Sequence, residues 1–433
     1  MRGLGNVEPW VELNTLLDKV EEYVKEFNHY VIPKGENIFG FWMQTLADLE
    51  LLDLELQGLT KEYKIDPINR TVEFKGDAEL LRLRIAHLEK VKGKTTLYTD
   101  FVDSYNDTNA YAFHNLYPYK GKFYPRVVRT LINAFGLTQN DLILDPFNGS
   151  GTTTHEASLM GVGSVGIDIT PMGVILSNLK NELPFLKEDE LNFTTKELME
   201  ILHIIEKREW KHPNKTIYNL MLIIYFDTVD AFTRTSRYNR KGKVGLFIEK
   251  FNYIKACHQK LIEIKEKYNL EFKKAMIIEG NVLELKKYTG FKNKFDAIIT
   301  SPPYYFSIDY VGKDKIAYDY LGVDMKKIES KYLGMKNTTS KRKYGNLPPK
   351  VILYYEDLRK SIENMHWALK HGGKMAIITG DSTVNGKKIP TTMITKKFCE
   401  EVGFKFKRLI FNPLLGARNR AIRGESIIIC RKE

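Results

Sequence analysis

Hydrophobic and polar residues follow one pattern of spacing up to about residue 110 and a different pattern after it. In the first part, apolar residues recur at helical spacing in three stretches, 9–29, 40–58 and 77–91. Alternation in TVEFK (71–75) adds one short strand. These patterns predict a small, mostly helical N-terminal domain over residues 1–105. Nothing in it suggests catalysis, so we expect a scaffold, with docking of a substrate as the less favoured alternative.

After residue 110, short apolar runs alternate with helical patterns. The runs that predict strands are DLILDPF (141–147), GSVGIDI (163–169), KAMIIEGNV (274–282), FDAIITS (295–301), GGKMAIITG (372–380) and ESIIICR (425–431). Helical patterns lie between many of them, for example at 125–135, 151–160 and 355–370. Such alternation predicts an open α/β sheet with helices on both faces, in which ligands bind at the carboxyl ends of the strands. We assign 106–182 and 273–433 to this domain.

Residues 183–272 interrupt the alternation with a mostly helical pattern that is too long for a simple crossover, which predicts a helical insertion able to recognise a substrate. Its stretch TRTSRYNRKGK (233–243) has five basic residues, no acid and one tyrosine. A second stretch, KNTTSKRKYGNLPPK (336–350), lies outside the insertion and has the same numbers of basic, acidic and tyrosine residues. Such runs are usually solvated loops. Phosphate contact and base stacking are an equally weighted alternative, with Arg237, Arg240 and Lys241 as candidate contacts.

Charge is distributed unevenly along the chain, whose net charge is +12. Residues 1–110 carry 13 Lys and Arg against 20 Asp and Glu, a net charge of −7, and the remainder carries +19. A basic body indicates a polyanionic partner. The alternative is the lysine enrichment of thermophiles, since Lys, Glu and Ile abound and glutamine occurs only at positions 44, 57, 139 and 259.

Several classes of protein do not fit this sequence. No run of eighteen or more apolar residues is present, so we expect no membrane partner. The first residues, MRGLGNVEPWVEL, lack the apolar block of a signal peptide. The three cysteines, Cys257, Cys399 and Cys430, lie far apart, which argues against a disulfide framework or a zinc site. We therefore expect a cytoplasmic protein without a bound metal.

The segment DLILDPFNGSGTTT (141–154) is an apolar strand that runs into a glycine-rich turn and then a helix. Gly149 and Gly151 permit a tight turn and close approach of the backbone to a ligand. Asp145 ends the strand, where its carboxylate can meet an ammonium or a hydroxyl group. The next strand ends 23 residues later at Asp168, a place where an acid hydrogen-bonds ribose hydroxyls. Turn and acid together predict an adenosine-type cofactor.

A second motif ends the apolar strand at 295–301, where the chain reads TSPPY. DPFNGSGTT and TSPPY together resemble the amino-methyltransferases that methylate exocyclic nitrogens of nucleobases with S-adenosylmethionine. The resemblance covers 110–182 and 274–433, extends to archaeal ribosomal RNA cytidine methyltransferases, and implies a Rossmann-like α/β domain. The cofactor-binding residues that it implies, together with those above, are Lys122, Phe123, Asp145, Pro146, Phe147, Gly149, Gly151, Thr152, Asp168 and Asn281. The family commonly has Asp at position 281.

The resemblance makes Ser301, Pro302, Pro303 and Tyr304 the candidate catalytic residues. An aromatic amino group is a poor nucleophile because its lone pair is delocalised into the ring. Hydrogen-bond acceptors placed below the two N–H bonds favour a tetrahedral amino nitrogen, whose lone pair can attack. The Ser301 hydroxyl and the Pro302 carbonyl can be these two acceptors. Pro303 stiffens the tip, and Tyr304 offers a face on which an extruded base can stack.

The substrate follows from the same resemblance. Ser at position 301 is usual for N4 of cytosine, whereas Asp or Asn there is usual for N6 of adenine or for glutamine side chains. Further candidate substrate contacts are Tyr305, Asp309, Tyr310, Arg418 and Arg420. We favour RNA, most plausibly ribosomal RNA in the ribosomal subunit, because an acidic N-terminal domain is unusual in a protein that encloses duplex DNA. The alternatives are duplex DNA, as in a restriction-modification enzyme, and a nucleic-acid-binding protein without catalysis.

Overall fold

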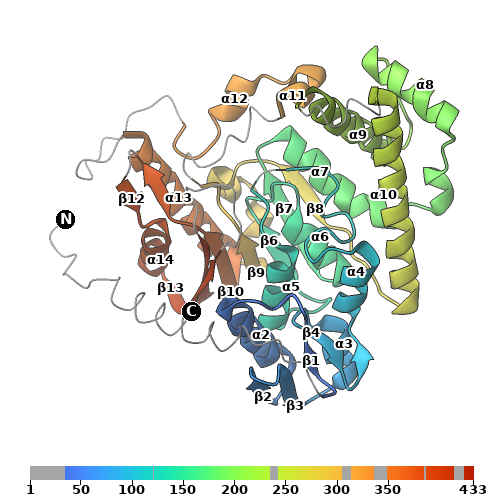
Figure 1. Cartoon of the computed structure of the whole chain (residues 1–433). Coiled ribbons are helices and arrows are strands. Elements are labelled where there is room, and N and C mark those ends of the chain that lie inside the picture. The colour runs from blue at the N-terminus through green and yellow to red at the C-terminus, as the bar shows by residue number, and fades with distance from the viewer. Residues whose placement is uncertain are drawn as a thin grey trace.

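A seven-stranded sheet forms the centre of the computed structural model (Figure 1). The structure describes residues 35–119, 121–234, 242–304, 314–335, 349–384, 387–413 and 424–433. The strands are β6 (Leu142–Asp145), β7 (Gly163–Asp168), β8 (Met276–Glu279), β9 (Phe295–Thr300), β10 (Leu369–Thr379), β13 (Phe404–Pro413) and β14 (Gly424–Lys432). Their order is β13-β14-β10-β9-β6-β7-β8. β14 runs antiparallel to both of its neighbours, β10 and β13. The other six strands therefore all run in one direction, and their carboxyl ends lie at one edge of the sheet.

Helices cover both faces of this sheet because successive residues of its strands point to opposite sides. Ile143 and Ile299 face α5 (Pro125–Ala134) and α6 (Thr152–Leu159) in one buried core. Leu144 and Ile298 belong to a second core, under α13 (Pro349–Ala368) and α14 (Thr391–Val402). The predicted α/β sheet with helices on both faces is confirmed. A hairpin of β11 (Ser382–Val384) and β12 (Lys387–Ile389) precedes α14.

The path of the chain creates a switch point beside β6. From β6 the chain continues through α6 to β7 and then through α7 (Pro171–Glu182) and further helices to β8 on one side, and it later returns to β9 and β10 on the other side. Ligands of open α/β sheets bind in the crevice that such a reversal leaves at the carboxyl ends of the strands. This crevice lies between the ends of β6 and β9, where the two sequence motifs meet.

Residues 35–105 fold around a five-stranded antiparallel sheet of order β2-β3-β1-β4-β5. The strands are β1 (Ile38–Phe39), β2 (Glu62–Asp66), β3 (Thr71–Lys75), β4 (Leu88–Val91) and β5 (Lys94–Thr95), and the helices are α2 (Leu46–Leu59), α3 (Ala78–Arg84) and α4 (Leu97–Tyr105). The predicted strand at 71–75 is confirmed as β3. We predicted three helices and one strand, and this sheet is the main difference. The predicted helix at 9–29 lies outside the described residues.

Local chemistry explains where the two other predicted helices deviate. The helix predicted over 40–58 begins at Leu46, because Thr45 and Asp48 form a reciprocal capping box. The helix predicted over 77–91 is wrong beyond Arg84, where Ile85 turns into extended backbone and the chain continues as β4. Leu88 and Val91 are buried there, while the two residues between them are partly exposed.

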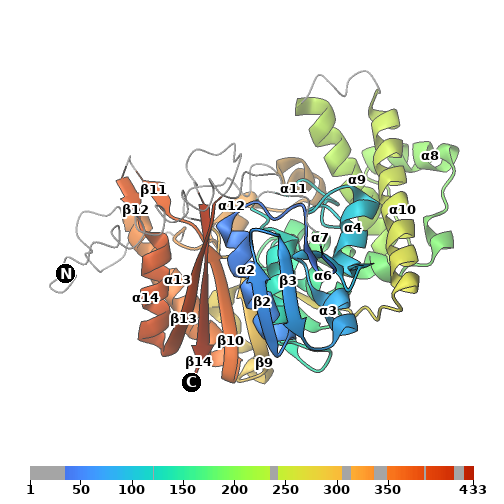
Figure 2. The ribbon, with the colours of Figure 1, turned by 60° about the horizontal axis from the view of Figure 1, so that its bottom comes forward.

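The small N-terminal sheet and its helices dock on α5 and β13 through buried and partly buried polar contacts. Glu55 is fully buried and accepts hydrogen bonds from Asn133 Nδ2 on α5 (2.7 Å), the Ala86 amide (2.9 Å) and His87 Nδ1 (2.7 Å). Arg408 on β13 pairs with Asp53 on α2 at 2.8 Å. Figure 2 shows α2 beside the central sheet.

The segment between α7 and β8 is helical, with α8 (Thr195–Glu206), α9 (Lys215–Arg234) and α10 (Gly242–Lys267). These helices share one buried core with α7 and with α4. Figure 1 shows them on the right, and α11 (Lys315–Leu321) and α12 (Met325–Glu329) above the sheet. The antiparallel β14 ends at the lower side, so the shared carboxyl edge lies at the upper side, away from the small sheet (Figure 1). In the described part of the chain, no helix is long and apolar enough to cross a membrane.

Candidate active site

Asp145 ends β6 at the bottom of the crevice and is fully buried. Its Oδ1 accepts hydrogen bonds from the Thr300 hydroxyl (2.6 Å) and from the Phe147 amide (3.1 Å). Its Oδ2 is buried and has no hydrogen-bond partner among the described residues. Burial raises the pKa of Asp145 to about 6, because desolvation disfavours the ionised form more than these hydrogen bonds favour it.

The glycine-rich turn after Asp145 requires its glycines. Gly149 and Gly151 have φ of +50° and +79°, which is the left-handed region that favours glycine. A Cβ added to Gly151 would lie 2.6 Å from the Cβ of Ser177 on α7. The Gly149 amide donates to Asp168 Oδ2 at 2.7 Å, so the second motif acid holds the turn in place.

Asp168 stands at the end of β7 and also orders the turn that follows. Its Oδ1 accepts from the Thr170 amide (2.8 Å) and the Thr170 hydroxyl (2.5 Å). Burial raises its pKa in spite of these bonds. Each carboxylate oxygen has two acceptor sites, and among the described residues Oδ2 accepts only the Gly149 amide, so a ribose hydroxyl fits this position as well.

Asn281 follows β8 at the same edge, and its side-chain amide is already engaged. Its Oδ1 accepts from the Leu283 amide at 2.9 Å, and its Nδ2 donates to the Lys331 carbonyl just after α12 at 3.2 Å. The side chain therefore anchors the α12 segment to the carboxyl end of β8. These bonds use one N–H of Nδ2 and one acceptor site of Oδ1, so the amide keeps one of each for the contact with the adenine that the resemblance implies.

Lys122 and Phe123 lie in the loop that precedes α5. Lys122 Nζ donates to the carbonyls of His114 (3.0 Å) and Tyr117 (3.3 Å), which orders the loop before α5. Phe123 is 8% exposed and belongs to the core that contains Ile299. The other implied cofactor residues belong to the turn itself: Pro146 and Thr152 are buried, and Phe147 is partly buried.

The Ser-Pro-Pro-Tyr tip begins directly at the end of β9. Thr300 joins the tip to the glycine-rich turn through its hydrogen bond to Asp145, and Thr153 Oγ1 of α6 donates to the Ile299 carbonyl at 3.2 Å. Ser301 is partly exposed, and Pro302 is buried. The sequence motifs that we predicted to cooperate are thus one hydrogen bond apart.

Two residues that the sequence analysis missed hold the tip in place. The Tyr354 hydroxyl of α13 donates to the Pro303 carbonyl at 2.9 Å. The Tyr304 hydroxyl donates to Glu425 Oε1 of β14 at 2.8 Å, and burial raises the pKa of Glu425. Neither partner belongs to a motif, and each comes from an element that only the folded sheet brings near the tip. We name these contacts the two tip bonds.

S-adenosylmethionine fits the residues that are present. The unpartnered, buried Asp145 Oδ2 is an acceptor without a donor, which the ammonium of the methionine part supplies. The positive φ of Gly149 and Gly151 favours glycine at both positions, and glycine leaves the turn without a side chain there. Asp168 lies one strand away, at the position expected for the ribose.

Eight predicted substrate contacts lie outside the described residues. They are Arg237, Arg240, Lys241, Tyr305, Asp309, Tyr310, Arg418 and Arg420. Their roles stay predictions.

Known proteins resemble this chain in sequence. A family model described as DNA methylase matches residues 17–174. "Type II methyltransferase M.BsoBI" of Geobacillus stearothermophilus is 24% identical over 440 residues, which cover 77% of this chain and 86% of that protein. "Type II methyltransferase M.MjaII" of Methanocaldococcus jannaschii is 27% identical over 45% of this chain and 32% of that protein. A "tRNA (guanine(10)-N2)-dimethyltransferase" of Methanothermobacter thermautotrophicus is 47% identical over 51 residues, 12% of this chain and 15% of that protein.

The central sheet, the glycine-rich turn after Asp145 and the Ser-Pro-Pro-Tyr tip together define a nucleic-acid methyltransferase that uses S-adenosylmethionine. Residues 17–174 match the model of the N6/N4 amino-methyltransferases, which is described as DNA methylase, and the two Type II methyltransferase alignments support the same family. The predicted family, enzyme class and cofactor are confirmed. Of our two expectations for the nucleic acid, the comparisons support DNA better than RNA.

Proposed function

We propose that this chain is a site-specific DNA methyltransferase that methylates N4 of cytosine. The observation that carries the chemistry is the Ser301-Pro302 tip at the end of β9, joined to the cofactor turn by the 2.6 Å bond between Thr300 and Asp145. Support for DNA comes from the family model and from the long alignment with a Type II methyltransferase. This replaces our initial preference for ribosomal RNA.

The chain's own residues prepare the amino group for attack. S-adenosylmethionine supplies an electrophilic methyl group on its sulfonium. The Ser301 hydroxyl and the Pro302 carbonyl accept the two N–H bonds of cytosine N4, which draws the lone pair out of the ring and towards the methyl group. These acceptors also stabilise the positive charge that develops on the nitrogen, and one preorganised contact of this kind contributes about 3 kcal/mol. The methyl–sulfur bond would break as the methyl–nitrogen bond forms, and the nitrogen would then lose one proton to water, so no protein nucleophile is needed.

The tip bonds keep these acceptors preorganised. The Tyr354 hydroxyl holds the Pro303 carbonyl, and the two prolines restrict the backbone, so the Pro302 carbonyl keeps one direction. The bond from Tyr304 to Glu425 fixes the ring on which the extruded cytosine stacks. Tyr304 is 8% exposed, so stacking on its ring requires that the ring become more accessible when the base enters.

The polymer is tested with methyl-labelled S-adenosylmethionine and equal masses of duplex genomic DNA and total RNA in one reaction. The proposal predicts label that is removed by deoxyribonuclease and resists ribonuclease. Label that only ribonuclease removes would overturn the choice of DNA. Ser301→Ala protein in parallel reports label that arises from a contaminating enzyme.

RNA is the second candidate, and one observation favours it. The 51 residues that resemble a tRNA dimethyltransferase are more identical, at 47%, than the longer alignments. They cover only 12% of this chain, which is why DNA is preferred. Ribosomal subunits form a third arm of the same experiment.

A further inference from the structure

The loop from α8 to α9 gathers positive charge that has no acidic partner. Lys207, Arg208, Lys211 and Lys215 are all exposed, and no ion pair to any of them occurs among the described residues. Arg208 lies over the ring of Tyr320 at 5.4 Å and Lys215 over that of Tyr218 at 4.5 Å, contacts that leave their charge uncompensated. Only one acid, Glu209, falls within 207–215.

A second group of unpaired lysines lies on and just after α12. Lys326, Lys327 and Lys331 are exposed, and the described residues contain no ion pair to them either. We call the seven cations the basic rim: Lys207, Arg208, Lys211, Lys215, Lys326, Lys327 and Lys331.

The neighbouring helix α10 is also rich in lysine, and three of its six lysines form ion pairs. Lys243 pairs with Glu206 at 2.6 Å, Lys250 pairs with Asp227, and Lys267 pairs with Asp100. Lys255, Lys260 and Lys265 of α10 form no ion pair among the described residues, so the basic rim is distinguished by its place on the upper side of the molecule and not by unpaired charge alone.

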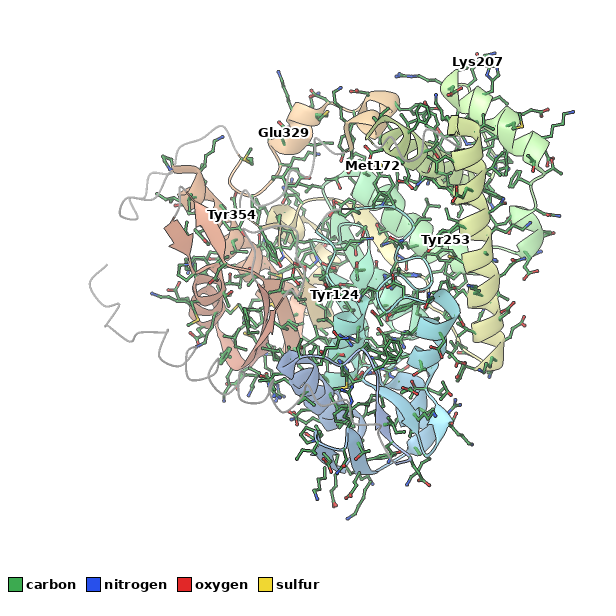
Figure 3. The ribbon with its side chains drawn as sticks, viewed as in Figure 1. Tyr124, Met172, Lys207, Tyr253, Glu329 and Tyr354 are labelled. Carbon is green, nitrogen blue, oxygen red and sulfur yellow. The ribbon has the colours of Figure 1, made fainter. Side chains whose placement is uncertain are left out.

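Both parts of the basic rim lie on the upper side of the molecule, the side of the shared carboxyl edge. The Lys331 carbonyl is bonded to Asn281 at the end of β8. The last turn of α8 is tied to α11 by the Tyr320 hydroxyl, which donates to the Ile205 carbonyl at 3.1 Å, and Arg208 of the following loop lies over the Tyr320 ring. Figure 3 places Lys207 and Glu329 of α12 along the upper side, above Met172 at the start of α7.

We propose that the basic rim binds the phosphate backbone of the duplex on the side of the target base. The proposal rests on the proposed function, because it takes the polyanion to be DNA. Clustered like charges repel one another and are favourable only when a polyanion covers them. Each phosphate that a lysine or arginine neutralises releases counterions, so binding through the rim depends steeply on salt.

The test compares two variants that lose the same charge. The rim variant carries Lys207→Gln, Arg208→Gln, Lys211→Gln and Lys215→Gln. The control variant carries Lys61→Gln, Lys64→Gln, Lys90→Gln and Lys94→Gln, all in the small sheet at the opposite end. The dissociation constant for a fluorescent duplex is measured by anisotropy from about 50 to 200 mM salt.

We expect the slope of log K against log salt to become shallower by about 2 to 4 units in the rim variant, since each phosphate contact contributes about 0.9. It should change by less than about one unit in the control. Affinity for S-adenosylmethionine should stay unchanged in both. Equal slopes in the two variants would overturn the proposal. If the quadruple variant does not fold, Lys207→Gln and Lys211→Gln alone should each lower the slope by about one unit.

A parallel arm with single-stranded RNA of the same length separates the two proposals. If the rim variant loses slope on RNA but not on DNA, the basic rim binds RNA and the duplex proposal is overturned. Methyl transfer by the unchanged protein is measured independently. A wrong proposed function would show as absence of methyl transfer to DNA. A wrong proposal for the basic rim would show as equal slopes of log K against log salt in the rim and control variants.

Discussion

Thr300 and Ser301 are adjacent residues that serve two different sides of the site. The Thr300 hydroxyl points to the cofactor turn and bonds Asp145, while Ser301 begins the tip that meets the base. The sequence motifs located both residues correctly at a strand end. The bond between the motifs could not be predicted, because it depends on β6 and β9 being neighbours across 155 residues of chain.

Replacing Ser301 by alanine removes one of the two acceptors for the amino group. We expect the single-turnover rate of methyl transfer to fall about 100-fold, equivalent to about 3 kcal/mol. Affinity for S-adenosylmethionine, measured by calorimetry, should not change. Ser301→Thr keeps the hydroxyl and should retain more activity than Ser301→Ala. Wild-type turnover in Ser301→Ala would remove this hydroxyl from the mechanism.

Asp145 gives the cofactor site a pH dependence. Its pKa is raised to about 6 by burial, and only the ionised form pairs with the cofactor's ammonium. Affinity for S-adenosylmethionine should therefore weaken as the pH falls through 6. Without cofactor the sign of the stability effect is opposite: the folded state holds the proton more tightly than the unfolded state, so stability falls as pH rises between about 4 and 6.

Calorimetric titrations at several pH values with Asp145→Asn as the comparison check this account. The variant should bind S-adenosylmethionine weakly, with a flat profile between about pH 5 and 7. An unchanged profile in Asp145→Asn would assign the titration to another group, with Asp168 the next one to replace.

At the scale of elements, the sequence predicted most of the central sheet and much less of its surroundings. Six of the seven strands coincide with predicted runs because buried parallel strands are almost continuously apolar. β13 was missed as a strand, since charged residues break its pattern and its register shifts between Phe406 and Arg408. The end of α3 was missed because residues 85–91 fit a helical spacing as well as a strand until the contacts of His87 are known.

The contact between α13 and the tip provides a prediction at this scale. Tyr354→Phe removes only the hydroxyl that holds the Pro303 carbonyl. Such a bond contributes about 1 kcal/mol, so we expect kcat to fall about fivefold with an unchanged KM for S-adenosylmethionine. The matched control is Tyr355→Phe in the same helix, whose hydroxyl bonds Thr391 instead. Equal effects of the two variants on kcat would contradict a special role of Tyr354.

At the scale of the whole molecule, the small N-terminal sheet and the basic rim lie at opposite ends (Figure 1). The acidic residues that the structure describes between 35 and 105 therefore lie away from the carboxyl edge, which weakens our reason for doubting a DNA duplex as substrate. Sequence reasoning weighed the charge of this segment but not its position. Its position follows from buried polar contacts such as that between Glu55 and Asn133, which no pattern of residues marks.

The scaffold role of this segment is tested at Glu55. Glu55→Ala leaves the Ala86 amide and Asn133 Nδ2 without their buried acceptor. We expect a loss of about 2 to 4 kcal/mol in the free energy of unfolding, measured by denaturant titration, with unchanged kcat where the protein is folded. Glu62→Ala, which breaks an exposed ion pair with Lys75, should change stability by less than about 1 kcal/mol. Comparable losses in both variants would contradict the docking role of Glu55.

The measurement that tests the central claim most directly is the identity of the methylated nucleoside. Duplex DNA is incubated with the protein and deuterium-labelled S-adenosylmethionine, digested to nucleosides and separated by chromatography with mass detection against authentic standards. The account predicts labelled N4-methyldeoxycytidine, absent with Ser301→Ala. Labelled N6-methyldeoxyadenosine or 5-methyldeoxycytidine would contradict it.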